Sequence, residues 1–283
     1  MKKIYASITA VGSFLPQTVL SNLDLEKIVD TNDEWITTRT GIKERRILDK
    51  GIGTSYMAIN AAKAIIEEKE INTLEIDLVI VATITPDMHA TATAAFVASK
   101  IGATNAFGFD INAACSGFLY GMSTASAFIE SGRYNKILLI GADKMSSIVD
   151  YTDRNTCIIF GDGAGAVLIE PNSEGLGVQD EYLRSDGNNR DLLRIEAGGS
   201  QTPITVEAVN EKKHFIYQDG KNVFKHAVSN MADASEKIMK RNGLNNTDVN
   251  FLVAHQANKR IIDATSNRMG IVDEKVLMNI HRY

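Results

Sequence analysis

Short apolar runs without polar alternation recur along this 283-residue chain, separated by amphipathic segments. A strand buried on both faces has this pattern, because neither face needs polar side chains. One segment between the runs has an apolar stripe at helical spacing, with Thr54 or Ser55 available as its N-cap. Strands that alternate with helices predict an α/β fold with helices on the faces of a sheet. We expect strands at residues 78–82, 136–141 and 166–169, a first strand before Pro16, and helices at 57–66 and 118–129.

The composition narrows the class of protein. A net charge of −5 argues against a general nucleic-acid binder, and 44% hydrophobic residues exclude a disordered chain. Two cysteines cannot form a secreted disulfide scaffold, and no His/Cys spacing matches a zinc site. No apolar run reaches the roughly 18 residues of a membrane helix. The first residues faintly resemble a signal peptide, but a first strand is the favoured interpretation, and we expect a soluble cytoplasmic protein.

A partial internal repeat in the sequence indicates that the chain has two related parts. Residues 71–81 and 244–254 both follow an amphipathic helix and enter an apolar run through an acidic or amide turn. Residues 100–102 and 268–270 extend this internal repeat, and each precedes a further expected strand. The alternative is that both copies reflect common helix–turn–strand order. The favoured hypothesis divides the chain into an N-terminal half, 1–170, and a C-terminal half, 171–283, with buried strands at 251–254 and 276–280.

The second predicted half has fewer elements than the first. The first half continues beyond its matching strand with a cysteine-bearing turn, a helix and two strands, whereas the second stops at Tyr283. We therefore expect a chain truncated at its C-terminus.

Cys115 is the first candidate for chemistry. It lies between the expected strand around Phe109 and a helical stripe that begins at Phe118. This places the cysteine near a helix N-terminus, where free N–H groups and the helix dipole favour a thiolate. A buried structural cysteine is the alternative for Cys115, and it is the favoured interpretation for Cys157, which lies in a strand-like apolar run.

A cysteine nucleophile needs a base or an electrostatic partner. Among five histidines, His255 differs because it ends the expected strand 251–254 and begins a loop. Catalytic sites form at such strand ends in α/β sheets, although a lone strand-end histidine is more often structural. The glycine-rich stretch 161–166 lacks the lysine of a P-loop, so we interpret it as a tight turn.

Four separate motifs give the chain a resemblance to a known family, the β-ketoacyl-acyl-carrier-protein synthases III. These condensing enzymes start type II fatty-acid synthesis. The motifs occur in the family's order and span almost the whole chain. They are DEWI at 33–36 with TRTGI at 38–42, NAACSG at 112–117, DR at 153–154 with FGDGAGA at 160–166, and HQAN at 255–258.

The resemblance implies a thiolase-type fold, in which two α/β halves form a layered αβαβα core, usually as a homodimer. Cys115 would accept the acyl group of acyl-CoA, and its N–H would contribute to an oxyanion hole. His255 would hydrogen-bond the malonyl thioester carbonyl and stabilise the enolate. Trp35 would stack on the CoA adenine, while Arg39 and Arg154 would contact its phosphates.

The resemblance also implies the partners. Malonyl-acyl carrier protein would dock beside the histidine, where basic side chains can meet an acidic carrier. Because acyl-CoA is a substrate, no cofactor or metal is expected, and neither nucleic acid nor membrane is an expected partner. The carrier-binding residues are expected to be Gln256, Ala257, Asn258, Lys259 and Arg260.

Two features depart from the family pattern. The third catalytic residue, an asparagine of a Gly-Asn-Thr motif, would come just after Tyr283, and Asn279 lies inside the preceding expected strand. We therefore expect weak or no condensation by this chain. In addition, residues 88–91 lack the Phe-Pro pair found in many relatives, which favours longer or branched primers.

Three alternatives stay open from the sequence. A relative of the same fold could pass its acyl group to another acceptor. A Cys–His thioester hydrolase is compatible with the spacing, although the Trp35–Arg39 motif favours CoA use. A catalytically impaired fragment could act only as a dimer partner.

Overall fold

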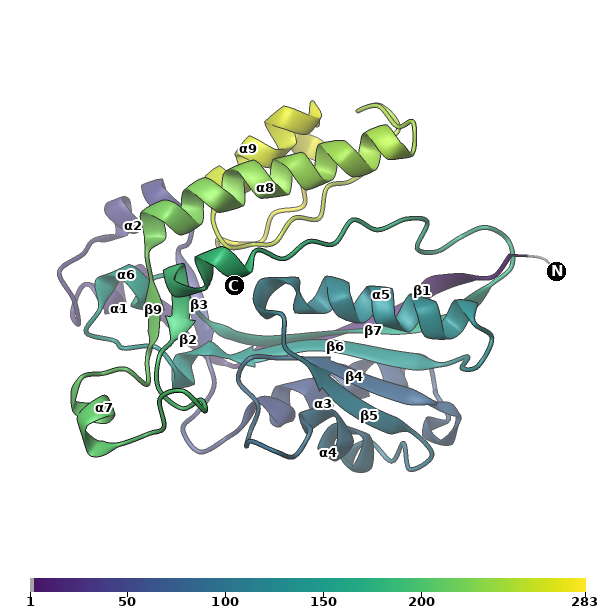
Figure 1. Ribbon diagram of the computed structural model, residues 1–283, viewed down its shortest axis with the longest axis horizontal. Coiled ribbons are helices and arrows are strands. Elements are labelled where there is room, and N and C mark those ends of the chain that lie inside the picture. The colour runs from purple at the N-terminus through teal and green to yellow at the C-terminus, as the bar shows by residue number, and fades with distance from the viewer. Residues whose placement is uncertain (1–2) are drawn as a thin grey trace. The chain divides into compact units, whose positions relative to one another are not determined.

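The fold comes from a computed structural model and covers residues 3–283, which group into two compact units (Figure 1). The first unit comprises residues 3–18, 46–144 and 162–181, and the second comprises residues 19–45, 145–161 and 182–283. Among residues 3–283, no helix is both long and apolar enough to span a membrane.

A five-stranded sheet, in the order β1-β7-β6-β4-β5, forms the centre of the first unit. Strand β4 is parallel to both β5 and β6, whereas β7 is antiparallel to β6 and β1. The carboxyl ends of β4, β5 and β6 therefore lie at the same edge of the sheet. The predicted strands of this unit are confirmed: β1 Tyr5–Phe14, β4 Leu78–Ala82, β5 Phe107–Ile111, β6 Ile137–Lys144 and β7 Asp162–Asn172.

Helices cover both faces of this sheet (Figure 1). Leu78 and Ile80 of β4 pack in one core with α5, and Val79 and Val81 pack in the other core with α3 and α4. Successive strand residues point to opposite faces, so an uninterrupted apolar run suits a strand covered twice. Within the predicted stripe of α5, Leu119 is instead 59% exposed. The helices are α3 Thr54–Glu68, α4 Thr93–Lys100 and α5 Gly117–Glu130.

The predicted N-cap of α3 is wrong. The cap residue is Gly53, which has no side chain to offer, and Thr54 and Ser55 are buried inside the first turn. The carboxylate of Asp87 takes the capping role, because it accepts hydrogen bonds from the backbone N–H (2.9 Å) and hydroxyl (2.6 Å) of Ser55. A remote loop thus satisfies the donors that a local side chain was expected to satisfy.

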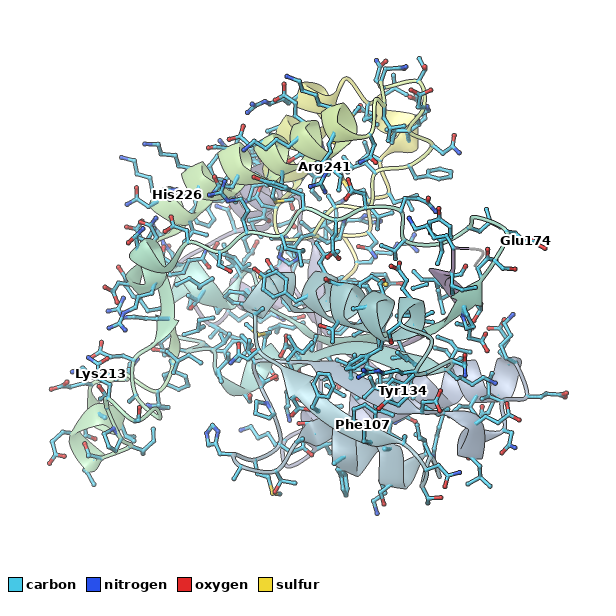
Figure 2. All side chains as sticks on the ribbon, turned by 45° about the vertical axis from the view of Figure 1, so that its right-hand side comes forward. Phe107, Tyr134, Glu174, Lys213, His226 and Arg241 are labelled. Carbon is cyan, nitrogen blue, oxygen red and sulfur yellow. The ribbon has the colours of Figure 1, made fainter. Side chains whose placement is uncertain are left out.

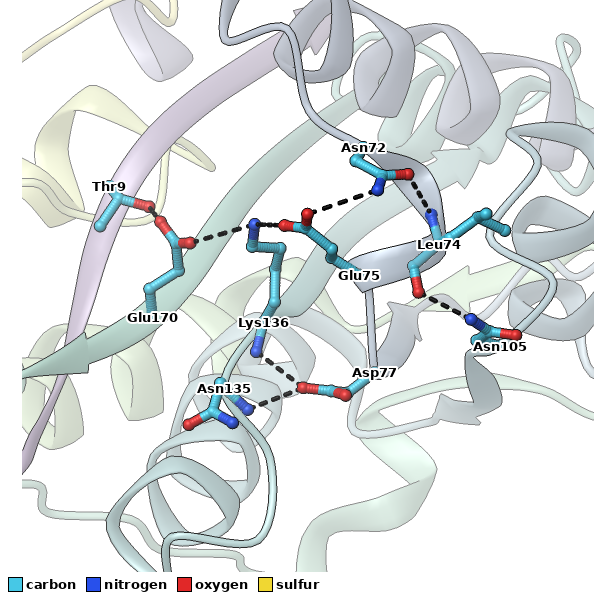
Figure 3. Close-up of polar contacts among 9 residues, drawn as sticks. All are labelled: Thr9, Asn72, Leu74, Glu75, Asp77, Asn105, Asn135, Lys136 and Glu170. Atoms are coloured by element: carbon cyan, nitrogen blue, oxygen red, sulfur yellow. Dashed lines mark hydrogen bonds and ion pairs between the residues drawn. The ribbon is translucent and has the colours of Figure 1, made fainter.

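Polar side chains join the loops at the amino edge of the parallel strands (Figure 3). The ammonium group of Lys136 lies 2.7 Å from Glu75 and 3.7 Å from Glu170. The carboxylate of Asp77 accepts hydrogen bonds from the backbone N–H groups of Asn135 (2.7 Å) and Lys136 (3.0 Å). These bonds fix the start of β6 beside the start of β4.

The second unit is mainly helical. The two longest helices, α8 and α9, pack against each other, and β8 pairs antiparallel with β9. The apolar stripe predicted before residue 244 lies in α8, where it is half-buried. The elements assigned wholly or in part to this unit are β2 Thr18–Ser21, α1 Asn22–Leu25, α2 Asp33–Thr40, β3 Glu44–Ile47, α6 Arg154–Cys157, β8 Leu193–Ile195, α7 Val206–Asn210, β9 Ile216–Gln218, α8 Gly220–Arg241 and α9 Lys259–Met269.

The two buried strands predicted for the second half do not form. Residues 251–254 and 276–280 meet through one isolated parallel bridge, Leu252–Val276. Phe251 and Val253 are 61% and 75% exposed, so this apolar run is not a core strand. The cause is local, because the side chain of Gln256 bonds the backbone groups that the next rung of a ladder would use.

Two further expectations need correction. Cys157 ends the short helix α6 rather than lying in a strand, since Asp153 caps that helix through the N–H of Asn155. Its complete burial agrees with a structural role.

The glycine-rich stretch is not a tight turn, because Gly163 and Gly165 pair with β6 inside β7. Neighbouring strands on both sides of β7 supply the hydrogen-bond partners that keep these glycines extended.

Candidate active site

Cys115 lies at the elbow between β5 and α5, as predicted. It lies in a one-turn 3-10 helix, Ala114–Ser116, which leads directly into α5. Ala114 has φ = +46°, a left-handed conformation that is strained for a residue with a Cβ atom. The thiol is free and the residue is exposed. The strained elbow therefore presents the cysteine at the carboxyl edge of the sheet.

The acidity of this thiol differs from the sequence-based expectation. Burial of the thiol among surrounding atoms raises the pKa of Cys115, and the negative charge of Asp143 raises it further. The sequence-based expectation was the opposite, because a helix N-terminus favours a thiolate. Cys115 therefore rests as a neutral thiol, so its attack on a thioester requires removal of a proton.

Asp143 anchors the turn that follows β4. Its Oδ1 atom accepts four hydrogen bonds: from the hydroxyls of Thr83 and Thr85, and from the backbone N–H groups of Ile84 and Thr85, at 2.8–3.2 Å. Burial raises the pKa of Asp143, and these donors oppose that shift. Asp143 thus stabilises the carboxyl edge of the sheet and sets the local charge around Cys115.

His255 follows the bridge at Leu252 and precedes α9. The residue keeps exposed surface, yet loss of hydration lowers the pKa of its imidazole below the ordinary value. A neutral imidazole at physiological pH can donate one hydrogen bond or accept a proton. His255 is therefore suited to hydrogen-bond a carbonyl oxygen without carrying a permanent charge.

The three residues predicted to bind CoA lie together in the second unit. The guanidinium carbon of Arg39 lies 4.3 Å from the ring centre of Trp35, and that of Arg154 lies 5.3 Å from it. Arg154 also donates a hydrogen bond to the carbonyl of Asp30 (2.9 Å). Trp35 is only half-buried, so its ring is not a core residue. An aromatic face and two cations thus share one surface.

The start of α2 explains how this cluster is placed. The side chain of Asn32 caps the helix by accepting a hydrogen bond from the N–H of Trp35 (2.7 Å). Trp35 and Arg39 are four residues apart, so they lie on one face of the helix. The helix ends at Gly41, whose φ of +82° favours glycine. A Cβ atom at Gly41 would lie 2.7 Å from the Cβ atom of Lys259, so the two segments are closely packed.

The residues predicted to bind a carrier protein differ in what they can offer. Asn258 caps α9 through the N–H of Arg260 and donates to the carbonyl of Arg39 (3.1 Å), and the Gln256 side chain is also bonded to backbone. Ala257 is half-buried. Lys259 and Arg260 are exposed, with Lys259 paired to Asp263 (2.6 Å) and Arg260 lying 4.8 Å from the ring centre of Phe224. Positive charge is therefore available chiefly from Lys259 and Arg260.

Comparison with known proteins gives one consistent result. Residues 109–187 match the family model for 3-oxoacyl-[acyl-carrier-protein] synthase III, and residues 239–283 match the model for its C-terminal part. The chain is 57% identical to β-ketoacyl-[acyl-carrier-protein] synthase III of Chlorobaculum tepidum, over 98% of this chain and 85% of that protein. It is 53% identical to synthase III 2 of Bacteroides thetaiotaomicron, over 100% of this chain and 85% of that protein. The chain belongs to the β-ketoacyl-acyl-carrier-protein synthase III family.

The solved structures agree with this assignment. The synthase III structure from Thermus thermophilus matches with a TM-score of 0.89 and 38% identity, over 98% of this chain and 85% of that chain. The thiolase-type α/β fold expected from the motifs is thereby confirmed.

The candidate site residues of this synthase III chain fall into two groups. Cys115 and Asp143 lie in the first unit, whereas His255, the Trp35 cluster and the basic residues of α9 lie in the second. The meeting of Cys115 with His255 stays a prediction. Sequence reasoning missed Asp143, although a signal existed: a carboxylate at the end of an apolar strand occupies the edge where α/β sites form.

Proposed function

We propose that this chain catalyses the condensation of an acyl-CoA primer with malonyl-acyl carrier protein, giving a 3-oxoacyl-acyl carrier protein, CoA and CO2. The observation that carries the proposal is the free thiol of Cys115, a residue with exposed surface on a strained β5–α5 elbow in a chain of this family. Such a thiol can hold an acyl group between two half-reactions.

In the first half-reaction, the sulfur of Cys115 loses its proton and attacks the thioester carbonyl of acyl-CoA. The carbon–sulfur bond to CoA breaks, and the leaving CoA thiolate takes up a proton. Trp35 binds the flat adenine by stacking, and Arg39 and Arg154 neutralise phosphate. The proximity of these three side chains supports this role.

In the second half-reaction, the bond between the malonyl carboxylate and its α-carbon breaks and CO2 leaves. The electron pair passes into the thioester as an enolate, which His255 stabilises by a hydrogen bond to the carbonyl oxygen. The α-carbon then attacks the acyl group on Cys115, and the cysteine sulfur leaves. The lowered pKa of His255 supports this role, because a neutral imidazole keeps one N–H to donate.

The acylation step tests the proposal directly. Incubation with an acyl-CoA should add one acyl mass to the protein, and peptide mapping should place it on Cys115. Cys115→Ser should abolish the adduct, whereas Cys157→Ser should retain it because Cys157 is buried. An adduct elsewhere, or none, would contradict the proposal. Hydrolysis of the adduct in the absence of any other acyl acceptor would instead favour a thioester hydrolase.

We also propose that two copies pair along β5. This strand ends the sheet, so one of its edges is unpaired among the described residues. Phe107 is 41% exposed and lies beside Tyr134 (Figure 2), at a ring-centre distance of 5.3 Å. It also stacks on Phe109 (6.4 Å) and meets Phe128 edge-on (6.3 Å). An apolar, uncovered edge strand favours pairing with a second copy. Sedimentation should show a dimer that Phe107→Asp converts to a monomer; a monomeric parent chain would contradict this proposal.

The remaining expectations belong to the same proposal. Two free thiols and no disulfide among the described residues support a reducing, cytoplasmic location. The small side chains of Ala90 and Thr91, where many relatives have a Phe-Pro pair, support a primer longer or more branched than acetyl-CoA, and a scan of acyl-CoA primers tests this choice.

A further inference from the structure

The segment before His255 begins as one strand of a parallel pair. The N–H of Leu252 donates to the carbonyl of Lys275 (2.8 Å), and the N–H of Leu277 donates to the carbonyl of Leu252 (3.0 Å). In a regular parallel ladder, the next rung would join Ala254 to the carbonyl of Leu277 and the N–H of Asn279.

The side-chain amide of Gln256 occupies the place of that rung. Its Nε2 donates to the carbonyls of Ala254 (3.0 Å) and Leu277 (3.1 Å). Its Oε1 accepts from the N–H groups of Asn279 (3.0 Å) and Ile280 (3.2 Å). A primary amide offers two donor hydrogens and two acceptor lone pairs, so this amide is fully used.

We infer that Gln256 is a positioning residue for His255: its inserted amide ties the histidine loop to residues 277–280. His255 lies between Ala254, whose carbonyl the amide binds, and Gln256 itself, so the backbone on both sides is held. This inference rests on the proposed role of His255. It also separates Gln256 from Lys259 and Arg260, because no polar atom of the amide remains for a carrier protein.

The test replaces the amide with an unbranched apolar side chain of similar length, Gln256→Met, in the same 283-residue chain. Amide hydrogen exchange should accelerate at Asn279 and Ile280, whose N–H groups lose their acceptor. Exchange at Leu277 should not change, because its N–H bonds to Leu252. Unchanged exchange at Asn279 and Ile280 would overturn the inference, whether or not the chain condenses.

Kinetics distinguish positioning from docking and from a general structural role. Malonyl-carrier decarboxylation should fall by about 100-fold, the cost of a misplaced catalytic group. Cys115 acylation and the KM for the carrier protein should stay within roughly two-fold of the parent, the spread expected for an unaffected step. A raised KM with unchanged turnover would assign Gln256 to docking and overturn the inference. Equal losses in both half-reactions would assign it a general structural role.

Gln179→Met provides the matched control. The Nε2 of Gln179 also bonds two backbone carbonyls, those of Gly175 (2.9 Å) and Gly177 (3.0 Å), but on an exposed loop of the first unit. The same chemical change there should leave decarboxylation and exchange at Asn279 unaltered. A parent chain that fails to acylate Cys115 would sink the proposed function, whereas normal decarboxylation by Gln256→Met would sink only this inference.

Discussion

The thiol of Cys115 is subject to opposing influences. The nearby helix N-terminus favours a thiolate, whereas burial and the charge of Asp143 raise the pKa of the thiol. A neutral resting thiol is protected from indiscriminate alkylation and oxidation, which attack thiolates. Acylation then depends on a proton acceptor at the moment of attack.

Asp143→Asn should lower the pKa of Cys115. The substitution removes a negative charge but keeps an oxygen that can accept from Thr83, Ile84 and Thr85. Alkylation of Cys115 by iodoacetamide should therefore be faster at neutral pH and equal to the parent rate at high pH, in a Cys157→Ser background. Asp110→Asn is the control, since that carboxylate accepts from the N–H groups at the start of α4. An unshifted profile for Asp143→Asn would refute the electrostatic role.

Arg260→Glu should weaken carrier-protein use without affecting acyl-CoA use. The guanidinium is exposed beside Phe224, so its charge can meet an acidic partner. Reversing one interface charge typically costs about 1–3 kcal/mol, or roughly 10- to 100-fold in kcat/KM for the carrier protein. Lys259→Glu should have a smaller effect, because Lys259 already pairs with Asp263. Equal losses in Cys115 acylation and in the carrier-dependent step would argue against docking at α9.

At the scale of elements, periodicity was a reliable guide where two faces are buried. The runs at β4, β6 and β7 formed strands because helices or neighbouring strands cover them. The same reasoning failed at residues 251–254, where a side-chain amide ends the ladder after one bridge. It also failed at α3, where the capping group comes from a distant loop. Hydrophobic pattern does not reveal which polar side chain will bond the backbone at a strand end or at the start of a helix.

The cap of α3 gives a stability prediction. Asp87→Ala removes the acceptor for the N–H and hydroxyl of Ser55, leaving donors of the first helical turn unpaired. The free energy of unfolding should fall by about 1 kcal/mol, as for other N-cap losses. Asp49→Ala, which removes an exposed carboxylate of the same unit, should leave it unchanged within about 0.5 kcal/mol. Urea unfolding followed by circular dichroism measures both values; equal stability of the two variants would contradict the capping role.

At the scale of the whole molecule, the sequence was sufficient to predict the family, because four short motifs with distinct chemical roles occur in the family's order. Trp35, Arg39 and Arg154, which the sequence predicts to bind CoA, do lie together, and their binding of CoA stays a prediction. The division into halves at residue 170 stays a prediction, since it is defined by sequence repetition and the two compact units are defined by contacts. The chain spans 85% of the length of the curated relatives it matches.

The central claim is that Cys115 and His255 serve one reaction centre in one chain. Cross-linking tests it most directly: His255→Cys in a Cys157→Ser background leaves thiols only at 115 and 255, which a short bis-thiosulfonate can join. The account predicts one reagent bridging both sulfurs, seen as a single mass addition and one linked peptide pair. Two independent additions, one on each cysteine with no linked peptide, would contradict it.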